Sequence, residues 1–234
     1  LSTSRGRGPW KGGRIDPMEN CSIAPPYLLT LPVDGYDVVI GEVSLGGSGK
    51  ADIAGITNLV EDYGIAKDTR RASEAKKAVL CAGVNIVDEK EVKMWSMVSK
   101  GRTVGYGTRI RPVGKARFGE PLKVSVDYGG IWETELRGDY LALQYLKAMD
   151  MAMEIAWQMG IPKEAGKESI SGFGGVPGRG EIFERDGVRH VIERNPGISR
   201  LSVDKTLALL DQMDLLDNAV MVVDPVSRKV CDKM

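Results

Sequence analysis

Residues 36–57, YDVVIGEVSLGGSGKADIAGIT, decide the fold class because they hold two short apolar runs separated by a Gly-rich turn. The first run, residues 36–43, lacks the alternation of a half-exposed strand and is typical of a strand buried on both faces of a parallel sheet. Residues 52–57 predict a second short strand after the turn. The two runs together favour an α/β fold with a mostly parallel sheet.

The composition is that of a globular chain with one large domain or two small ones. The chain has 234 residues, of which 42% are hydrophobic and 27% charged. Its 32 basic and 32 acidic residues balance, which argues against binding nucleic acid through excess positive charge. No apolar run approaches the ~18 residues that a membrane span needs, and the 3 cysteines lack disulfide or zinc spacing. We therefore expect a cytoplasmic protein with neither a nucleic-acid nor a membrane partner.

Helices and strands alternate downstream. Residues 69–80 have helical composition, residues 103–107 read as a strand, and residues 112–135 alternate like antiparallel strands. The clearest helix is predicted over 139–160, with Asp139 as its cap and Gly160 at its end. We expect its methionines to pack in the core, and its apolar face to carry Leu141, Tyr145, Ala148, Ala152, Ile155 and Met159.

A Gly-rich segment divides the chain into two predicted domains. Residues 171–180, SGFGGVPGRG, are typical of a hinge. A strand at 188–193, a helix at 202–213 and a strand at 219–223 follow, and this order predicts a small parallel sheet. The predicted domains are residues 1–173 and 174–234.

Two features near the first strand bear on phosphate and metal chemistry. The segment GSGK at 47–50 is not a Walker loop, because Ser44 and Ala51 stand where that loop needs Gly and Ser or Thr. Glu42 ends the buried run, where a carboxylate needs a compensating partner. It is either a hard oxygen ligand for Mg²⁺ or an ordinary strand-end residue, and its position alone leaves both interpretations open.

Three blocks in the right order resemble the Mur ligase family. Residues 36–77 resemble the strand with the metal-binding Glu, the Ala-Asp strand and the Lys-bearing helix of the central ATPase domain. Residues 137–164 resemble the family's long helix, and residues 171–199 its junction with a Gly-Arg-x-Glu signature. The resemblance implies a P-loop-type central domain whose phosphate loop lies upstream of these residues, then a truncated, smaller Rossmann-like α/β domain.

The resemblance also implies the site. Glu42 matches a Mg²⁺ ligand, Lys76 matches a lysine that is carbamylated in several members, and Asp62 is a further candidate metal ligand. Arg179 matches an arginine that contacts ATP from the hinge and, with Lys76, is a candidate catalytic residue. The remaining candidates for binding ATP are Asn58, Gln144 and Asn195.

Departures from the family pattern point to one branch. Tyr63 replaces the family's metal-binding His, and Tyr140-Leu141 replaces its His-Asn pair. These features resemble the branch that completes the nickel tetrapyrrole coenzyme F(430), which implies that ATP activates a propionate carboxylate before an internal carbon nucleophile closes a ring. Two alternatives remain: an amide ligase of murein or pseudomurein synthesis, and a non-catalytic nucleotide- or tetrapyrrole-binding module.

Overall fold

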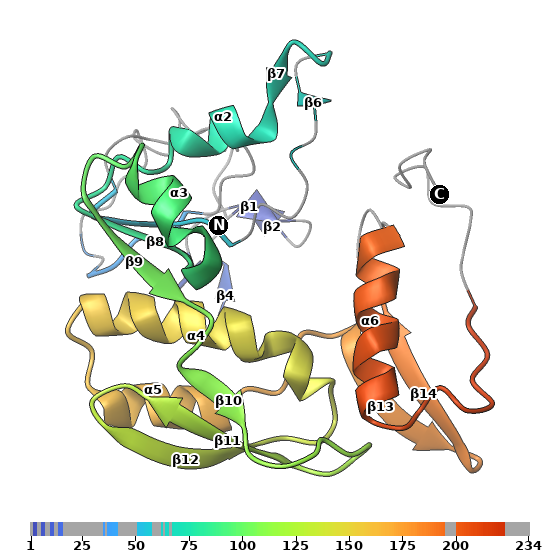
Figure 1. The fold of residues 1–234 in the computed structure, drawn as a ribbon. Helices are drawn as coiled ribbons and strands as arrows, with labels where there is room; N and C mark the ends of the chain where they lie inside the picture. Colours follow the sequence, from blue (N-terminus) through green and yellow to red (C-terminus); the bar gives the residue numbers. More distant parts are fainter. Residues whose placement is uncertain are drawn as a thin grey trace. The chain divides into compact units, whose positions relative to one another are not determined.

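A computed structural model gives the fold (Figure 1). It describes residues 2–3, 6–7, 10–11, 14–15, 35, 37–41, 51–57, 62, 64–65, 67–194 and 200–222. The chain forms two compact units, residues 1–105 and 106–234, each described by itself. The domain boundary predicted at 173/174 falls inside the second unit and stays a prediction. Among the described residues, no helix has the length and apolar character needed to cross a bilayer.

The first unit is built around a short three-stranded sheet. Strand β5 (Ile53–Gly55) runs parallel to β8 (Val84–Asp88), and β9 (Arg102–Tyr106) lies on the other side of β8. Ile86 and Val87 of β8 are fully buried, as expected for a central strand of this class. Helix α2 (Ala72–Lys77) precedes β8 in the chain. Helices η1 (Glu89–Glu91) and α3 (Val92–Ser96) lie between β8 and β9. Trp95, Leu80 and Ile56 complete the core.

Six two-residue strands pair antiparallel in the same unit. The pairs are β1 (Ser2–Thr3) with β2 (Gly6–Arg7), β3 (Trp10–Lys11) with β4 (Arg14–Ile15), and β6 (Gly64–Ile65) with β7 (Arg70–Arg71).

The strand predicted over 36–43 is wrong for the part that the structure describes. Residues 37–41 form no ladder, and Ile40 is 82% exposed. An apolar run becomes a buried strand only if neighbouring strands pair with it, and no described strand does so. The strand predicted at 52–57 is confirmed as β5, and the helix predicted at 69–80 is confirmed in shortened form as α2.

The second unit begins with an antiparallel sheet covered by two helices. Strands β10 (Ile110–Pro112), β11 (Leu122–Asp127) and β12 (Ile131–Leu136) form a meander, which confirms the alternating pattern. Helix α4 (Ala142–Gln158) packs on β10, and α5 (Lys163–Ser171) packs on β12 and α4 (Figure 1). The core of this unit includes Val124, Val126 and Leu136, which are fully buried.

The long helix is present, but its buried face differs from the prediction. Ala148 and Ala152 are exposed, whereas the buried positions are Ala142, Met149, Asp150, Met153 and Glu154. Asp139 is not the cap, because the N-cap residue is Leu141. Gly160 follows the helix at φ +72°, the left-handed conformation expected there.

The last elements form a hairpin instead of the predicted parallel unit. Strands β13 (Arg179–Arg185) and β14 (Val188–Glu193) pair antiparallel across Asp186-Gly187, whose φ angles of 53° and 75° suit a two-residue hairpin turn. Helix α6 (Arg200–Gln212) follows, but residues 219–222 form no strand. The tight turn fixes the direction of β14, so the sheet at this point is antiparallel.

Candidate functional site

The start of α4 is joined to β13 by backbone hydrogen bonds. The Leu141 amide donates to the Gly180 carbonyl at 2.6 Å, and the Ile182 amide donates to the Asp139 carbonyl at 3.1 Å. These two bonds give β13 a fixed register against the residues that lead into α4. We call this region the junction: residues 139–145, 176–182 and Glu193.

A side-chain contact closes the junction. The Gln144 amide nitrogen Nε2 donates to Glu193 Oε2 at 3.1 Å. The other oxygens of the pair, Gln144 Oε1 and Glu193 Oε1, are buried and have no hydrogen-bond partner among the described residues. The junction therefore presents two acceptors whose hydrogen-bonding capacity is unused.

Gly180 permits this close packing. Its φ is +61°, and a Cβ built on it would lie 2.6 Å from Gln144 Oε1 and 3.1 Å from Leu141 Cβ. Any other residue would have to push the Gln144 side chain away from the strand. Gly180 is thus required both by its backbone conformation and by the approach of the amide.

Arg179 is exposed beside the same contact. Its carbonyl accepts from the Tyr145 hydroxyl at 2.7 Å, and that hydroxyl accepts from the Val176 amide at 3.3 Å. Burial raises the pKa of Tyr145, which keeps its hydroxyl available as a donor. The structure therefore brings two of the predicted nucleotide-binding residues, Gln144 and Arg179, to one junction.

Asp62 lies in the first unit and caps α2 from outside the helix. Its carboxylate accepts from the Ser73 amide at 2.8 Å and from the Ser73 hydroxyl at 2.9 Å, while Arg71 donates to its carbonyl at 3.2 Å. The backbone hydrogen bond from Ser73 is the main cause that holds the pKa of Asp62 below its usual value. The carboxylate is thus ionised and already serves a structural role.

The two adjacent lysines of α2 have different surroundings. Lys76 is half-buried and Lys77 is exposed. The basic side chains whose charges act on Asp62 are those of Arg71 and Lys77. Lys77 is therefore the lysine of this pair whose charge is seen to lower the pKa of Asp62.

The predicted magnesium site cannot be assembled from the part of the chain that the structure describes. Glu42, Asn58 and Asn195 lie outside the described residues. Within them, no group of three His, Cys, Asp or Glu side chains could hold a metal ion. The assignment of Glu42, Lys76 and Asp62 to Mg²⁺ stays a prediction.

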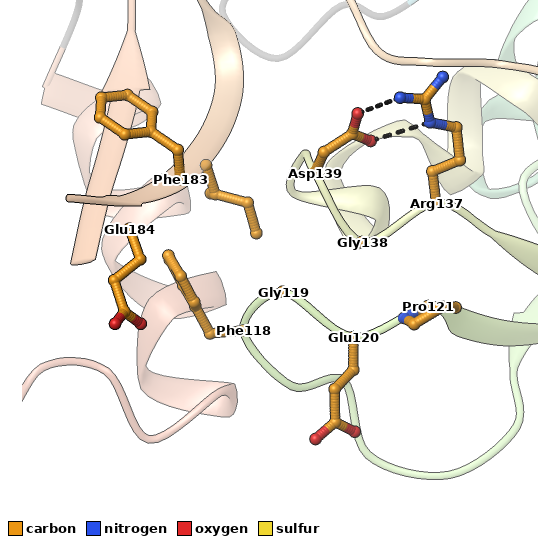
Figure 2. A pocket seen from close by; sticks show the side chains of 10 residues that line it. Phe118, Gly119, Glu120, Pro121, Arg137, Gly138, Asp139, Phe183 and Glu184 are labelled. Atoms are coloured by element: carbon orange, nitrogen blue, oxygen red, sulfur yellow. Dashed lines mark hydrogen bonds and ion pairs between the residues drawn. The ribbon is translucent and has the colours of Figure 1, made fainter. Parts of the chain in front are cut away.

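An open depression of about 600 Å³ lies beside the junction (Figure 2). The rings of Phe118 and Phe183 line it, with the ion pair of Arg137 and Asp139 on another wall. None of the predicted site residues lines this depression.

Comparisons with known proteins agree with the sequence motifs. No model of a known protein family matches the chain. The chain is 28% identical over 267 residues to coenzyme F(430) synthetase of Methanosarcina acetivorans, which covers 99% of this chain and 56% of that protein. The chain thus spans about half the length of the curated relative that it matches.

Solved structures show which fold this is. MurF from Acinetobacter baumannii superposes with a TM-score of 0.54 at 17% identity, over 69% of this chain and 37% of MurF. A structure of UDP-N-acetylmuramoylalanyl-D-glutamyl-2,6-diaminopimelate–D-alanyl-D-alanyl ligase from the same organism gives 0.53 at 15% identity with equal coverage. The chain has the Mur ligase fold. With the curated relative, this fold supports assignment to the coenzyme F(430) synthetase branch of the Mur ligase superfamily.

Tyr140 and Leu141 stand where the family pattern has His-Asn, and both side chains are buried. Tyr140 packs edge-on against Tyr145 and Phe173, with ring centroids 5.4 and 5.5 Å apart. Its hydroxyl has no hydrogen-bond partner among the described residues. The substitution therefore replaces polar groups with an aromatic cluster that packs the start of α4.

Three residues of the junction were missed by sequence reasoning. The sequence pattern predicts only an apolar helix face for Tyr145 and a hinge for Gly180. Glu193 carries a usable signal, because it follows the apolar pair Val191-Ile192 at the end of β14, as Glu42 ends its own run. A carboxylate in that position needs a partner, and the structure supplies Gln144.

Proposed function

We propose that the complete protein is an ATP-dependent ligase of the Mur type that activates a carboxylate as an acyl phosphate. The observation that carries the proposal is the junction, which contains both Gln144 and Arg179 in a chain with the Mur ligase fold. Its unused acceptors suit the amino group of a nucleotide base, and the exposed guanidinium of Arg179 suits phosphate oxygens. ATP supplies the phosphoryl group when it is bound.

The remaining predicted residues complete the proposed site. Glu42, Lys76 and Asp62 would hold Mg²⁺, and Asn58 and Asn195 would contact the nucleotide. Phosphoryl transfer brings several anionic oxygens together, so fixed positive charge is needed more than a strong base. The segment around 172–180 would let the second predicted domain close over the nucleotide and exclude water from the acyl phosphate.

The substrate we propose is a nickel tetrapyrrole precursor of coenzyme F(430), with ring closure as the reaction and the cytoplasm as the compartment. The support is the similarity to coenzyme F(430) synthetase across 99% of this chain. The neighbouring solved structures share only the fold and do not discriminate between acceptors.

The test is a product assay on the complete protein. Purified protein is mixed with MgATP and either the seco-acid tetrapyrrole or a muramoyl peptide with an amino-acid acceptor. ADP and phosphate release is measured together with product mass. We expect turnover with the tetrapyrrole and a product that has lost one water. Turnover with the peptide alone would identify an amide ligase, and nucleotide binding without turnover of either substrate would indicate a non-catalytic module.

A further inference from the structure

We propose that Glu193 is a positioning residue that fixes the side-chain amide of Gln144, so that its oxygen is the acceptor for the amino group of an adenine nucleotide. The inference rests on the proposed function because it concerns the same nucleotide site. Glu193 would act through Gln144 and would not touch the reacting atoms.

The direction of the amide follows from the chemistry of its partner. An ionised carboxylate can only accept hydrogen bonds, so the group of Gln144 that faces Glu193 must be the nitrogen. The oxygen of Gln144 is thereby turned toward Gly180, where the absence of a Cβ leaves room for it. Two features of the chain, the carboxylate and the glycine, thus select one of the two amide orientations.

In this orientation, two buried oxygens of the pair remain without a hydrogen-bond donor in the part of the chain that the structure describes. Gln144 Oε1 and Glu193 Oε1 are both buried and without a partner among the described residues. Buried acceptors without donors are unfavourable, so a ligand that brings a donor is favoured over one that brings another acceptor. A 6-amino purine supplies N–H donors at this position, whereas a 6-oxo purine supplies an oxygen.

To reach the pair, a ligand has to displace the protein atoms that cover the two oxygens. Gln144 and Glu193 are each only half-buried as residues, although the two oxygens are covered. A base that enters there replaces protein cover with hydrogen bonds. Selectivity for the amino group would follow, because a site whose buried polar groups are left unpaired discriminates strongly against a ligand that lacks the matching group.

The experiment measures base selectivity. Binding of MgATP and MgITP to the complete protein is measured by calorimetry, and thermal unfolding checks that each variant folds. The wild type should prefer ATP. Glu193→Gln removes the obligate acceptor, so the Gln144 amide can turn either way and the preference should fall about tenfold. The matched control Glu164→Gln removes the same charge from an exposed position on α5 and should keep the preference.

Further variants separate positioning from a general structural role. Gln144→Ala should lose the preference, and adding Glu193→Gln to it should cause no further loss. Gly180→Ala, which displaces the Gln144 oxygen, should resemble Glu193→Gln and serves as the test if Glu193→Gln does not fold. The positioning role would be overturned if Glu193→Gln kept the ATP preference of the wild type. It would also be overturned if Glu193→Gln lowered the preference as much in the Gln144→Ala variant as in the wild type. Either result would leave the ligase proposal intact. Failure of the wild type to bind ATP would overturn both.

Discussion

The phenolic hydroxyl of Tyr128 donates to the carboxylate of Asp150 at 2.6 Å, although both side chains are buried. Burial is the main cause that raises the pKa of Tyr128 well above its usual value, so the hydroxyl remains a donor. The amides of Gly107 and Arg109 donate to the second oxygen of Asp150 at 2.7 and 2.9 Å. A single buried carboxylate therefore joins α4, the residue after β11 and the segment between β9 and β10.

Asp150→Ala should destabilise the second unit by about 3 kcal/mol, because it leaves two backbone amides without an acceptor and takes from the buried Tyr128 hydroxyl one of its two acceptors, the other being the backbone carbonyl of residue 150. Asp150→Asn should cost less, since its amide oxygen can still accept. Urea unfolding followed by circular dichroism measures both changes. Asp127→Asn, at an exposed position of β11, is the matched control and should stay within about 0.5 kcal/mol. Equal stability of Asp150→Ala and wild type would show that the hydrogen bonds of Asp150 make no net contribution to the free energy of unfolding.

The same network shows what sequence patterns could and could not predict. Helix α4 was predicted from its apolar spacing, but its buried face contains Asp150 and Glu154. Glu154 is paired with Arg109 at 2.5 Å, a residue 45 positions earlier in the chain. A hydrophobic pattern assigns charged positions to solvent, so the face that it predicts to be buried excludes both of these carboxylates. The pairing that makes burial of these carboxylates tolerable exists only in three dimensions.

In the candidate site, too, motifs predict single residues, whereas the contacts between them depend on the fold. Arg179 and Gln144 were predictable because they belong to motifs that resemble the family's. Their placement in one junction depends on the hairpin β13–β14, which pairs Arg179 with Glu193. The Asp186-Gly187 turn that creates this hairpin is a strong local signal against a parallel sheet. The contact between Gln144 and Glu193 joins residues 49 positions apart, and no local pattern specifies it.

Tyr140→Phe should leave the chain as stable at neutral pH, or more stable by up to about 1 kcal/mol, because it removes a buried hydroxyl that has no described partner. Burial raises the pKa of Tyr140 to about 12. The folded chain disfavours the ionised phenolate, so the free energy of unfolding does not depend on this group below its unfolded pKa of about 10 and falls as pH rises toward 12. The Phe variant should therefore lose less stability between these pH values than wild type. Urea midpoints across this range provide the measurement.

Tyr145→Phe is the natural comparison, because its hydroxyl donates to the Arg179 carbonyl. This variant should be destabilised by about 1 kcal/mol at neutral pH. If Tyr140→Phe were destabilised as much as Tyr145→Phe, the Tyr140 hydroxyl would have a partner after all.

Arg179→Ala should slow turnover of the complete enzyme by about 10²–10³, since it removes a fixed positive charge from the transferring phosphate. Its stability should change by less than about 0.5 kcal/mol because the side chain is exposed. Arg179→Lys should recover only part of the rate, because an ammonium cannot bind two phosphate oxygens as a planar fork does. Single-turnover kinetics with saturating MgATP separate the chemical step from binding. Full activity in Arg179→Lys would show that a point charge is sufficient at this position and that two-oxygen binding is not needed.

Lys76 and Lys77 provide the sharpest test of the metal assignment because they are adjacent but unequally buried. An ammonium at position 76 would compete with Mg²⁺, whereas a carbamate carries the opposite charge and offers two hard oxygens. Lys76→Ala should therefore lower activity about 10²–10³, and millimolar acetate or formate should restore part of it. Lys77→Ala, the matched control, removes an exposed side chain and should remain within about twofold of wild type. Rescue is measured as the rate of ADP release against carboxylate concentration for both variants. A Lys76→Ala enzyme that is inactive with and without added carboxylate would assign Lys76 to the phosphates as a cation, and a fully active one would remove this lysine from the site.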